Sequence, residues 1–563
     1  MKDDKRSVAE RLARPGLLNL KPYSSARDEF QGEGSVWLDA NESPFGLRYK
    51  GIPGLNRYPD PLQSQLKEEL SKRYRVPVHS IFAGNGSDEI IDLMIRAFCT
   101  PGRDTVIIMP PTYGMYEVQA RIHDLNVAEV PLTDQFLPDE EAIGEAAAAA
   151  VAAGRPAKIL FICSPNNPTG NITPNETIAS IAATFDGIVM VDEAYIDFSG
   201  SDGALSLTER YDNIMVIRTF SKARGMAGAR LGIGFSNREI TDLLNRIKLP
   251  YNVNSLTIDA GLRALETEEA TLQQIELIVE ERERISGELG KISGISKVWP
   301  SAANFLLVSV EEPLKLYRHL LERGIVIRDR SKVRGCEGTL RITVGTPPQN
   351  DLLLEAIADY FSPSGSAQPA FSAGTTETVQ RRTAETDIYV RFTPLGRGIG
   401  DIETGVGFLD HMLELLAFHS GSNIMIRGNG DLHIDAHHLV EDVALTLGAA
   451  IGQAVKNKPL ERYGFTLPMD ESLATVAVDI SGRPVLVFDV AFRDAMIGDM
   501  PAEMVEHFFL SLATAARCTI NIAASGQNDH HIAEAVFKAF GRALKMALQP
   551  SGGDRVASSK GVI

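Results

Sequence analysis

Apolar runs and amphipathic stretches alternate along about the first 235 residues of the chain. The apolar runs have the length of buried strands, and the stretches between them have the 3.6-residue period of helices. This alternation predicts an α/β domain with a mostly parallel sheet. A smaller α/β segment follows, from about residue 245 to residue 361. The first 361 residues therefore read as one unit with a large and a small part.

Three of the apolar runs end in polar residues that suit one kind of chemistry. They lead into S-P-N-N-P-T-G (164–170), D-E-A-Y (192–195) and R-T-F-S-K (218–222). The carboxyl ends of parallel strands meet at one crevice, where ligands bind, so these side chains are expected to converge.

The polar groups match an aldehyde-bearing pyridine cofactor. A lysine can form a Schiff base, a carboxylate can keep a pyridine nitrogen protonated, and amide, phenol, hydroxyl and guanidinium groups can hold a ring oxygen and a phosphate. Each motif alone is more often a surface lysine, a turn or a helix cap, but their order and spacing together favour the cofactor site. The residues are Asn167, Asp192, Tyr195, Ser221, Lys222 and Arg230.

The stretch from Ser164 to Arg230 resembles a fold-type I pyridoxal-phosphate aminotransferase, and its flanks resemble histidinol-phosphate aminotransferases. The resemblance implies pyridoxal 5'-phosphate as cofactor and Lys222 as the catalytic lysine. It also implies a large, mostly parallel sheet domain followed by a small α/β domain, together spanning residues 1–361.

Sequences upstream of this stretch extend the resemblance. In G-N-G-S-D-E (84–89) the free N–H groups at Gly86, Ser87 and Asp88 predict an anion site at a helix N-terminus, and the motif resembles the family's phosphate cup. In P-P-T-Y-G-M-Y the resemblance places Tyr113 on the pyridine ring. In R-Y-P-D it implies that Tyr58 reaches the cofactor phosphate of a neighbouring subunit, which requires a homodimer.

Substrate contacts are expected at both ends of the first unit. Two arginines on neighbouring strands, Arg328 and Arg341, suit a dianionic phosphate because each guanidinium binds oxygens in bidentate fashion. They match the positions that hold substrate phosphate in histidinol-phosphate aminotransferases, although threonine-phosphate decarboxylases share the scaffold. The resemblance also places Tyr23, in an N-terminal arm, and Asn41 near the substrate.

A segment rich in Ser, Pro, Gly and Ala (362–376) predicts a linker, and the distribution of histidines changes beyond it. Eight of the 11 histidines lie in the last 188 residues. F-L-D-H-M and H-H-L-V-E, which contain His411 and His437, recur as V-E-H-F and H-H-I-A-E, which contain His507 and His530. The recurrence predicts an α+β domain over residues 377–563, built from two repeated half-domains.

The repeated motifs predict two metal sites. His437 and Glu441 share a helix face, whereas the adjacent His438 points about 100° away, so neighbouring histidines cannot easily serve one ion. Each site is expected to collect ligands from both repeats. Imidazole and carboxylate ligands suit Mn, Fe, Co or Zn, and ligand type alone does not choose between them. The expected groups are His437, Glu441, His507 and His531 for one ion, and His411, His438, His530 and Glu534 for the other.

From about Val379 to the C-terminus these motifs resemble imidazoleglycerol-phosphate dehydratase. The resemblance implies manganese, large symmetric assemblies with sites between subunits, and acid–base roles for Glu385 and Glu534. Two segments depart from the family pattern, L-G-R-G (395–398) and the leucine at 415. The positions implied to contact substrate phosphate are Arg462, Arg483, Lys538, Ser558 and Lys560.

Composition narrows the class of protein. A chain of 563 residues is too long for one hydrophobic core. A net charge of −17 argues against nucleic acid or an anionic membrane as a partner. Four scattered cysteines, no apolar N-terminal segment and no apolar run of membrane-spanning length predict a cytoplasmic protein with free thiols.

Together the resemblances predict a bifunctional enzyme of histidine biosynthesis that dehydrates imidazoleglycerol phosphate and transaminates the product, imidazole acetol phosphate, with glutamate. A homo-oligomer is expected, a dimer through the first unit and a larger assembly through the second. One alternative gives the first unit another phospho-amino acid or amino acid as substrate. A ligand-sensing regulator would need a DNA-binding motif and a basic patch, and neither is visible. A metal-storage role for the second unit is disfavoured by Glu385 and the phosphate-side cations.

Overall fold

The computed structural model describes residues 7–20, 40–43, 45, 55–361, 376–455 and 463–549. The chain divides into two compact units, one comprising residues 1–344 and 356–361 and the other residues 345–355 and 362–563. The domain boundary expected at residue 361 stays a prediction. The expected linker, 362–376, lies outside the described residues except for Thr376.

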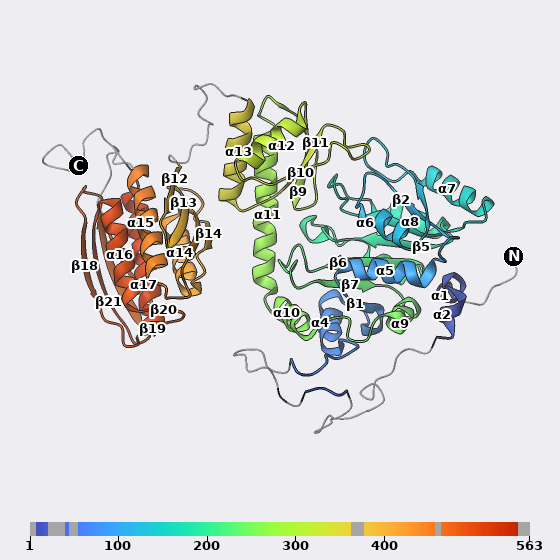
Figure 1. Ribbon diagram of the computed structural model, residues 1–563, viewed down its shortest axis with the longest axis horizontal. Helices are drawn as coiled ribbons and strands as arrows, with labels where there is room; N and C mark the ends of the chain where they lie inside the picture. Colours follow the sequence, from blue (N-terminus) through green and yellow to red (C-terminus); the bar gives the residue numbers. More distant parts are fainter. Residues whose placement is uncertain are drawn as a thin grey trace. The chain divides into compact units, whose positions relative to one another are not determined.

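A seven-stranded sheet forms the centre of the first unit (Figure 1). Its order is β1-β7-β6-β5-β4-β2-β3, and all pairings are parallel except those of β7. Because both faces of such a sheet are covered by helices, its strands read as continuous apolar runs. The strands are β1 (Ile81–Asn85), β2 (Thr105–Ile108), β3 (Asn126–Glu129), β4 (Ala157–Cys163), β5 (Ile188–Asp192), β6 (Ile214–Thr219) and β7 (Leu231–Phe235).

Two hydrophobic cores lie on opposite faces of this sheet. Side chains alternate between them along each strand, as Phe82 and its neighbour Ile81 do on β1. One core includes residues of α1 (Val8–Leu12), α5 (Ser87–Phe98), α6 (Met115–Ile122) and α9 (Arg238–Ile247), with Leu17 of α2 (Pro15–Leu18) packed against it. The other includes or contacts residues of α4 (Ser64–Tyr74), α7 (Glu140–Ala152), α8 (Asn175–Thr184) and α10 (Ser255–Glu266).

The smaller part of the first unit has an antiparallel sheet of order β10-β11-β9-β8. The long helix α11 (Glu268–Leu289) leads into it. Three 3-10 helices, η1 (Val78–Ser80), η2 (Ile196–Phe198) and η3 (Leu205–Glu209), lie in loops of the larger part. The other elements are β8 (Ile295–Val298), β9 (Phe305–Val310), α12 (Pro313–Glu322), β10 (Arg328–Asp329) and β11 (Thr339–Thr343). Helix α13 (Pro347–Phe361) follows, and only its residues 356–361 belong to this unit.

The second unit has two four-stranded sheets with identical topology. Their orders are β12-β13-β15-β14 and β16-β17-β21-β18, and in each the first two pairings are antiparallel and the last is parallel. The two sheets therefore share one strand order and one pattern of pairing. The strands are β12 (Glu377–Arg382), β13 (Thr386–Thr393), β14 (Gly400–Glu403), β15 (Asn423–Gly430), β16 (Tyr463–Met469), β17 (Ser472–Asp479), β18 (Val485–Val490) and β21 (Thr519–Ser525), with the short pair β19 (Met496–Ile497) and β20 (Met500–Pro501) between.

Four helices lie between these two sheets (Figure 1). They are α14 (Gly407–Ser420), α15 (His437–Ala454), α16 (Glu503–Ala516) and α17 (Asp529–Ala547). Their apolar faces and the inner faces of both sheets form one core. Helix α14 packs on α17, and α15 packs on α16, so each packed pair takes one helix from each half.

The four cysteines are buried and free, as their scattered positions predicted. Among the described helices, none combines the length and the apolar character that a membrane span requires.

Candidate active sites

Four strands bring their polar ends to one edge of the large sheet. Cys163 at the end of β4 is in register with Asp192 at the end of β5, and Asp192 is in register with Ile217 near the end of β6. Strand β7 runs the other way and begins at this edge, directly after Arg230. One cavity opens there, lined by Ser87, Asp88, Tyr113, Cys163, Asn167, Asp192, Ala194, Tyr195, Thr219, Ser221, Lys222 and Arg230.

Asp192 is a buried carboxylate in the wall of this cavity. The Tyr116 hydroxyl donates to its Oδ2 at 2.7 Å, and the backbone N–H of Ala194 donates to its Oδ1 at 3.1 Å. Burial raises the pKa of Asp192 to about 6, while these two hydrogen bonds act in the opposite direction. The carboxylate is thus ionised near neutral pH in a position to face a cationic nitrogen.

Lys222 lies across the cavity with its ammonium nitrogen 5.7 Å from the centre of the Tyr195 ring. Burial and the nearby charges of Arg341 and Arg230 lower the pKa of Lys222. A lowered pKa increases the fraction of neutral amine, which is the form that attacks an aldehyde or accepts a proton. The Asn167 amide donates to the Tyr195 hydroxyl at 3.4 Å and accepts from Arg341 Nη1.

The N-terminus of α5 forms a cradle beside these groups. Gly86 caps the helix at φ 76°, and its N–H donates to the Arg230 carbonyl at 2.8 Å. A Cβ on Gly232 would lie 2.3 Å from the backbone of Gly86 and Ser87, so glycine is required where β7 passes the helix end. The close approach leaves the first N–H groups of α5 directed at the cavity edge, where an anion binds favourably.

Charged side chains complete the cradle. Arg230 lies 3.3 Å from Asp88 and donates to the Ser221 hydroxyl at 3.4 Å. The Tyr113 hydroxyl donates to Asp88 at 3.3 Å, and burial together with this carboxylate raises the pKa of Tyr113 to about 12. The structure therefore brings together at this edge every expected cofactor residue except Tyr58.

Other expected substrate and cofactor residues lie elsewhere. Tyr58 is 51% exposed and stacks on Tyr251 with ring centres 4.5 Å apart, outside the cavity of its own chain. Asn41 is exposed, has a φ of 52° and does not line the cavity. Tyr23 lies outside the described residues. Arg328 on β10 is directly opposite Arg341 on β11, so the two side chains share one face of the strand pair.

In the second unit, one metal-type cluster joins α15 and α16. Nε2 of His507 lies 3.3 Å from Glu441 Oε2, and Nε2 of His437 lies 3.7 Å from the same oxygen. His507 Nε2 is buried without a hydrogen-bond partner, which leaves a lone pair for a cation. Three of the four residues expected for this ion therefore meet.

A second cluster joins α14 and α17 in the same way. Nε2 of His411 and Nε2 of His530 lie 3.0 and 3.2 Å from Glu534 Oε1. Lys538 donates to the other carboxylate oxygen at 2.6 Å. Although partial burial acts to raise it, the hydrogen bonds from Lys538, His411 and His530 lower the pKa of Glu534 to about 2. The carboxylate stays ionised, as a ligand must.

His438 and His531, the fourth expected ligand of each ion, do not join either cluster within the chain. His438 Nδ1 lies 3.0 Å from Asp431 and 3.9 Å from Glu385, and His531 Nδ1 lies 3.0 Å from Glu471. These carboxylates raise the pKa of both histidines. Within one chain the expected ligands thus form two clusters of three, and His438 and His531 lie beside their own carboxylates. The fourth ligand of each ion stays a prediction.

The remaining predicted residues of this unit are dispersed. Arg483 is exposed in the turn between β17 and β18. Lys538 is at the second cluster rather than in a separate cationic site. Leu415 packs against the hydrophobic core. Arg462, Ser558 and Lys560 lie outside the described residues.

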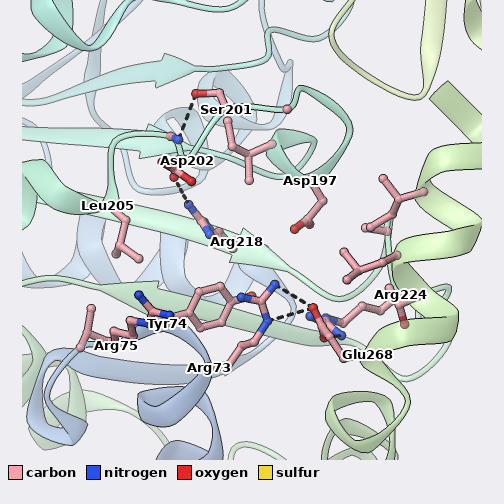
Figure 2. Close-up of a pocket in the computed structure, with 18 of the residues that line it drawn as sticks. Arg73, Tyr74, Arg75, Asp197, Ser201, Asp202, Leu205, Arg218, Arg224 and Glu268 are labelled. Atoms are coloured by element: carbon pink, nitrogen blue, oxygen red, sulfur yellow. Dashed lines mark hydrogen bonds and ion pairs between the residues drawn. The ribbon is translucent and has the colours of Figure 1, made fainter.

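A further cavity in the first unit has a different character (Figure 2). Arg73 and Arg224 both contact Glu268, each at 2.7 Å. Arg218 donates to Glu193 at 2.8 Å and to the Asp202 carbonyl at 2.9 Å. These guanidinium groups are neutralised within the wall, so the cavity offers less to a charged ligand than the strand-end cavity does.

Several residues near the sites were not predicted to be functional. Tyr116, in the first turn of α6, follows Tyr113 by three positions in the same motif, and the two rings meet edge-on. Arg330 follows Arg328 by two positions and comes directly after β10. Asp431 and Glu471 carry no motif of their own, and Glu471 is 60 positions from the histidine that it holds.

Comparison with known proteins identifies both parts of the chain. The model of the class I and II aminotransferase family matches residues 36–357, and that of imidazoleglycerol-phosphate dehydratase matches residues 404–544. A histidinol-phosphate aminotransferase of Cytophaga hutchinsonii is 47% identical over 349 residues, covering 62% of this chain and 98% of that protein. One of Parabacteroides distasonis is 48% identical over 346 residues, covering 62% and 97%.

A solved structure is similar to the first unit of the chain. The crystal structure of the histidinol-phosphate aminotransferase from Clostridium acetobutylicum is 27% identical, with a TM-score of 0.50. The similarity covers 54% of this chain and 91% of that chain.

Proposed function

Since the chain belongs to the class I and II aminotransferase family and carries an imidazoleglycerol-phosphate dehydratase domain, we propose that it is a bifunctional enzyme of histidine biosynthesis. The second unit dehydrates imidazoleglycerol phosphate to imidazole acetol phosphate. The first unit transaminates that product with glutamate and yields histidinol phosphate. The relatives that match the first unit are named for this second step.

The observation that carries the aminotransferase assignment is the convergence of Lys222, Asp192 and the α5 cradle on one cavity. These groups fit pyridoxal phosphate, because the cavity offers an amine with a lowered pKa, an ionised buried carboxylate and a helix N-terminus made accessible by Gly232. When bound, the cofactor supplies an aldehyde and an electron-accepting ring.

The residues of the chain then divide the remaining tasks. Asp192 keeps a proton on the ring nitrogen, with its own position set by Tyr116. Asn167 and Tyr195 hold the ring oxygen, and Arg230 and Ser221 hold the phosphate. Lys222 would move a proton at the substrate carbon that carries the amino group, because burial and the nearby arginines lower the pKa of its amine and so favour the neutral form.

In the second unit the two three-ligand clusters fit divalent metal ions, and the family resemblance favours Mn²⁺. Imidazole nitrogen with one carboxylate is a donor set that manganese accepts, and the buried Nε2 of His507, which makes no hydrogen bond and lies 3.3 Å from Glu441 Oε2, fits the role of a ligand. When bound, such ions act as Lewis acids and as a template for the substrate. Glu385, 3.9 Å from His438, is positioned to move a proton.

The two separated histidines support an assembly in which neighbouring chains complete each other's sites. His438 and His531 each have Nδ1 beside a carboxylate, an arrangement that orients the other ring nitrogen toward a metal. Neither reaches a cluster of its own chain. A homo-oligomer in which His438 and His531 enter clusters of adjacent chains gives each ion four ligands. In a dimer of the first unit, the exposed Tyr58 would likewise reach the cofactor phosphate of the neighbouring chain.

A coupled assay tests both assignments. The purified chain, loaded with pyridoxal phosphate and Mn²⁺, receives imidazoleglycerol phosphate and glutamate, and the expected product is histidinol phosphate. If imidazole acetol phosphate accumulates without transamination, the first unit acts on a different substrate. If the first substrate is not consumed at all, the dehydratase assignment is wrong.

A further inference from the structure

Three arginines, rather than two, lie on one face of the β10–β11 strand pair. Arg328 is directly opposite Arg341, and the backbone N–H of Arg330 donates to the Thr339 carbonyl at 3.0 Å, which continues the same ladder. Side chains two positions apart along a strand share a face, so Arg330 lies on the face of Arg328 and Arg341. Asp329 lies between Arg328 and Arg330 in the sequence, so its side chain points to the other face, where it accepts hydrogen bonds from Ser331.

The charge of this cluster is not balanced by the described part of the chain. Like charges directly opposite each other in a strand pair are destabilising. No ion pair joins Arg328, Arg330 or Arg341 to a carboxylate within the described ranges. Burial and the neighbouring guanidinium groups lower the pKa of Arg330 and of Arg341. A concentration of cations that the surrounding side chains leave unneutralised is the signature of an anion site.

Two buried donors in the cluster are also unsatisfied. Nε of Arg330 and Nε of Arg341 are both inaccessible to solvent and have no hydrogen-bond acceptor among the described residues. Buried donors are normally paired, and an unpaired one in a native structure indicates a missing partner. Two arginines that each have an unsatisfied donor, on one face of the strand pair, suit a tetrahedral anion as the missing partner of their guanidinium groups.

The cluster is connected to the cofactor cavity. Arg341 Nη1 donates to Asn167, which lines that cavity. The charges of Arg330 and Arg341 both interact with the hydroxyl of Tyr195, which lines the cavity as well. An anion held by the cluster therefore lies at the end of the substrate that is remote from the reacting carbon.

We propose that Arg330 supplies a third guanidinium to the substrate phosphate and sets the preference of the first unit for a dianionic over a monoanionic substrate. The inference rests on the proposed aminotransferase function. A third cation stabilises a dianion more strongly than a carboxylate, because its Coulomb energy scales with the charge of the ligand. The residue acts on substrate binding and leaves the chemistry at Lys222 unaltered.

The test compares Arg330→Gln with Arg334→Gln in the full chain loaded with pyridoxal phosphate. Arg334 is on the same segment, is largely exposed and lies 3.5 Å from Glu129, so it is a matched control for the loss of one arginine. Arg330→Gln is expected to raise KM for imidazole acetol phosphate roughly ten- to a hundredfold, the range of a charge-assisted hydrogen bond, with little change in kcat. The same substitution should raise the inhibition constant of inorganic phosphate far more than the inhibition constant of acetate.

Two further readouts separate binding from structure. The thermal midpoint of Arg330→Gln should equal or exceed that of wild type, because the substitution removes repulsion, and Arg330→Lys should restore part of the KM. Equal KM values for the Arg330→Gln and Arg334→Gln variants would overturn the proposal. A lowered thermal midpoint of Arg330→Gln would also overturn it, because partial unfolding would then explain the higher KM. Failure of the wild type to accept imidazole acetol phosphate would instead overturn the proposed function.

Discussion

The Tyr116 hydroxyl donates a 2.7 Å hydrogen bond to Oδ2 of Asp192, although 76 positions separate the two residues. Tyr116 is fully buried, stacks on Phe161 with ring centres 4.5 Å apart and meets the Tyr113 ring edge-on at 5.5 Å. One side chain of α6 therefore positions both the carboxylate that would hold a proton on the cofactor ring nitrogen and the aromatic residue expected to stack on that ring.

Replacing Tyr116 by Phe should weaken cofactor binding, most strongly at acid pH. The hydrogen bond from Tyr116 favours the ionised form of Asp192, so its loss raises the pKa of this carboxylate above about 6. The dissociation constant of pyridoxal phosphate, measured by absorbance at pH 6 and pH 8, should increase more at pH 6. Tyr317→Phe, on α12, serves as the control. An equal effect at both pH values would show that Tyr116 acts through packing alone.

Asp192→Asn should stabilise the cofactor-free protein relative to wild type as pH rises. The folded pKa of Asp192 is about 6 against an ordinary value of 3.8, so the folded state holds a proton that the unfolded state releases. Wild type loses stability from this group between about pH 4 and pH 6, by roughly 3 kcal/mol in total. Unfolding midpoints of both proteins across this range measure the difference, and parallel pH profiles would contradict the expectation.

Lys222→Ala should abolish transamination and leave dehydration intact. The amine of Lys222 lines the cofactor cavity and is the proposed nucleophile and proton carrier, whereas both metal-type clusters belong to the second unit. Supplied with imidazoleglycerol phosphate, the variant should accumulate imidazole acetol phosphate at the wild-type rate. His411→Ala should give the converse result, with transamination of added imidazole acetol phosphate retained.

Gly232→Ala should disrupt the phosphate cradle, and Gly228→Ala should not. A Cβ on Gly232 meets backbone atoms at 2.3 Å, whereas one on Gly228 meets nothing within 4 Å. Overpacking of this kind costs about 1–3 kcal/mol and moves the N-terminus of α5. The expected result is a lowered thermal midpoint and a much weaker affinity for pyridoxal phosphate in the first variant. Similar affinities in the two variants would show that the close approach is unimportant.

Glu441→Gln and Glu534→Gln should each remove one metal ion per chain. Each carboxylate is the central member of one cluster and contacts both of its histidines. Metal content after dialysis against Mn²⁺ should fall by half in each variant and stay unchanged in Glu503→Gln, which replaces an exposed residue in the first turn of α16. Removal of all metal by a chelator should lower the thermal midpoint of the second unit, because a ligand that binds the folded state stabilises it.

The sequence alone was sufficient to predict which functional side chains come together where this depends on their positions along single strands and helices. Lys222, Asp192 and Asn167 follow neighbouring parallel strands, and such strands end at one edge, so their convergence could be anticipated. His437 with Glu441 and His530 with Glu534 are one helical turn apart, so these ligand pairs could be anticipated as well.

Tertiary structure alone decided the contacts that join distant segments. The hydrogen bond from Tyr116 to Asp192 depends on how α6 packs against the sheet, and no periodicity encodes that packing. The partners of His438 and His531 depend on loops whose positions follow from the packing of the half-domains. The unbalanced charge of Arg330 depends on the register of β10 and β11, which places it beside Arg328 and Arg341 and not beside a carboxylate of the described residues. Side-chain periods are properties of single elements, whereas these contacts arise from the angle and register between elements.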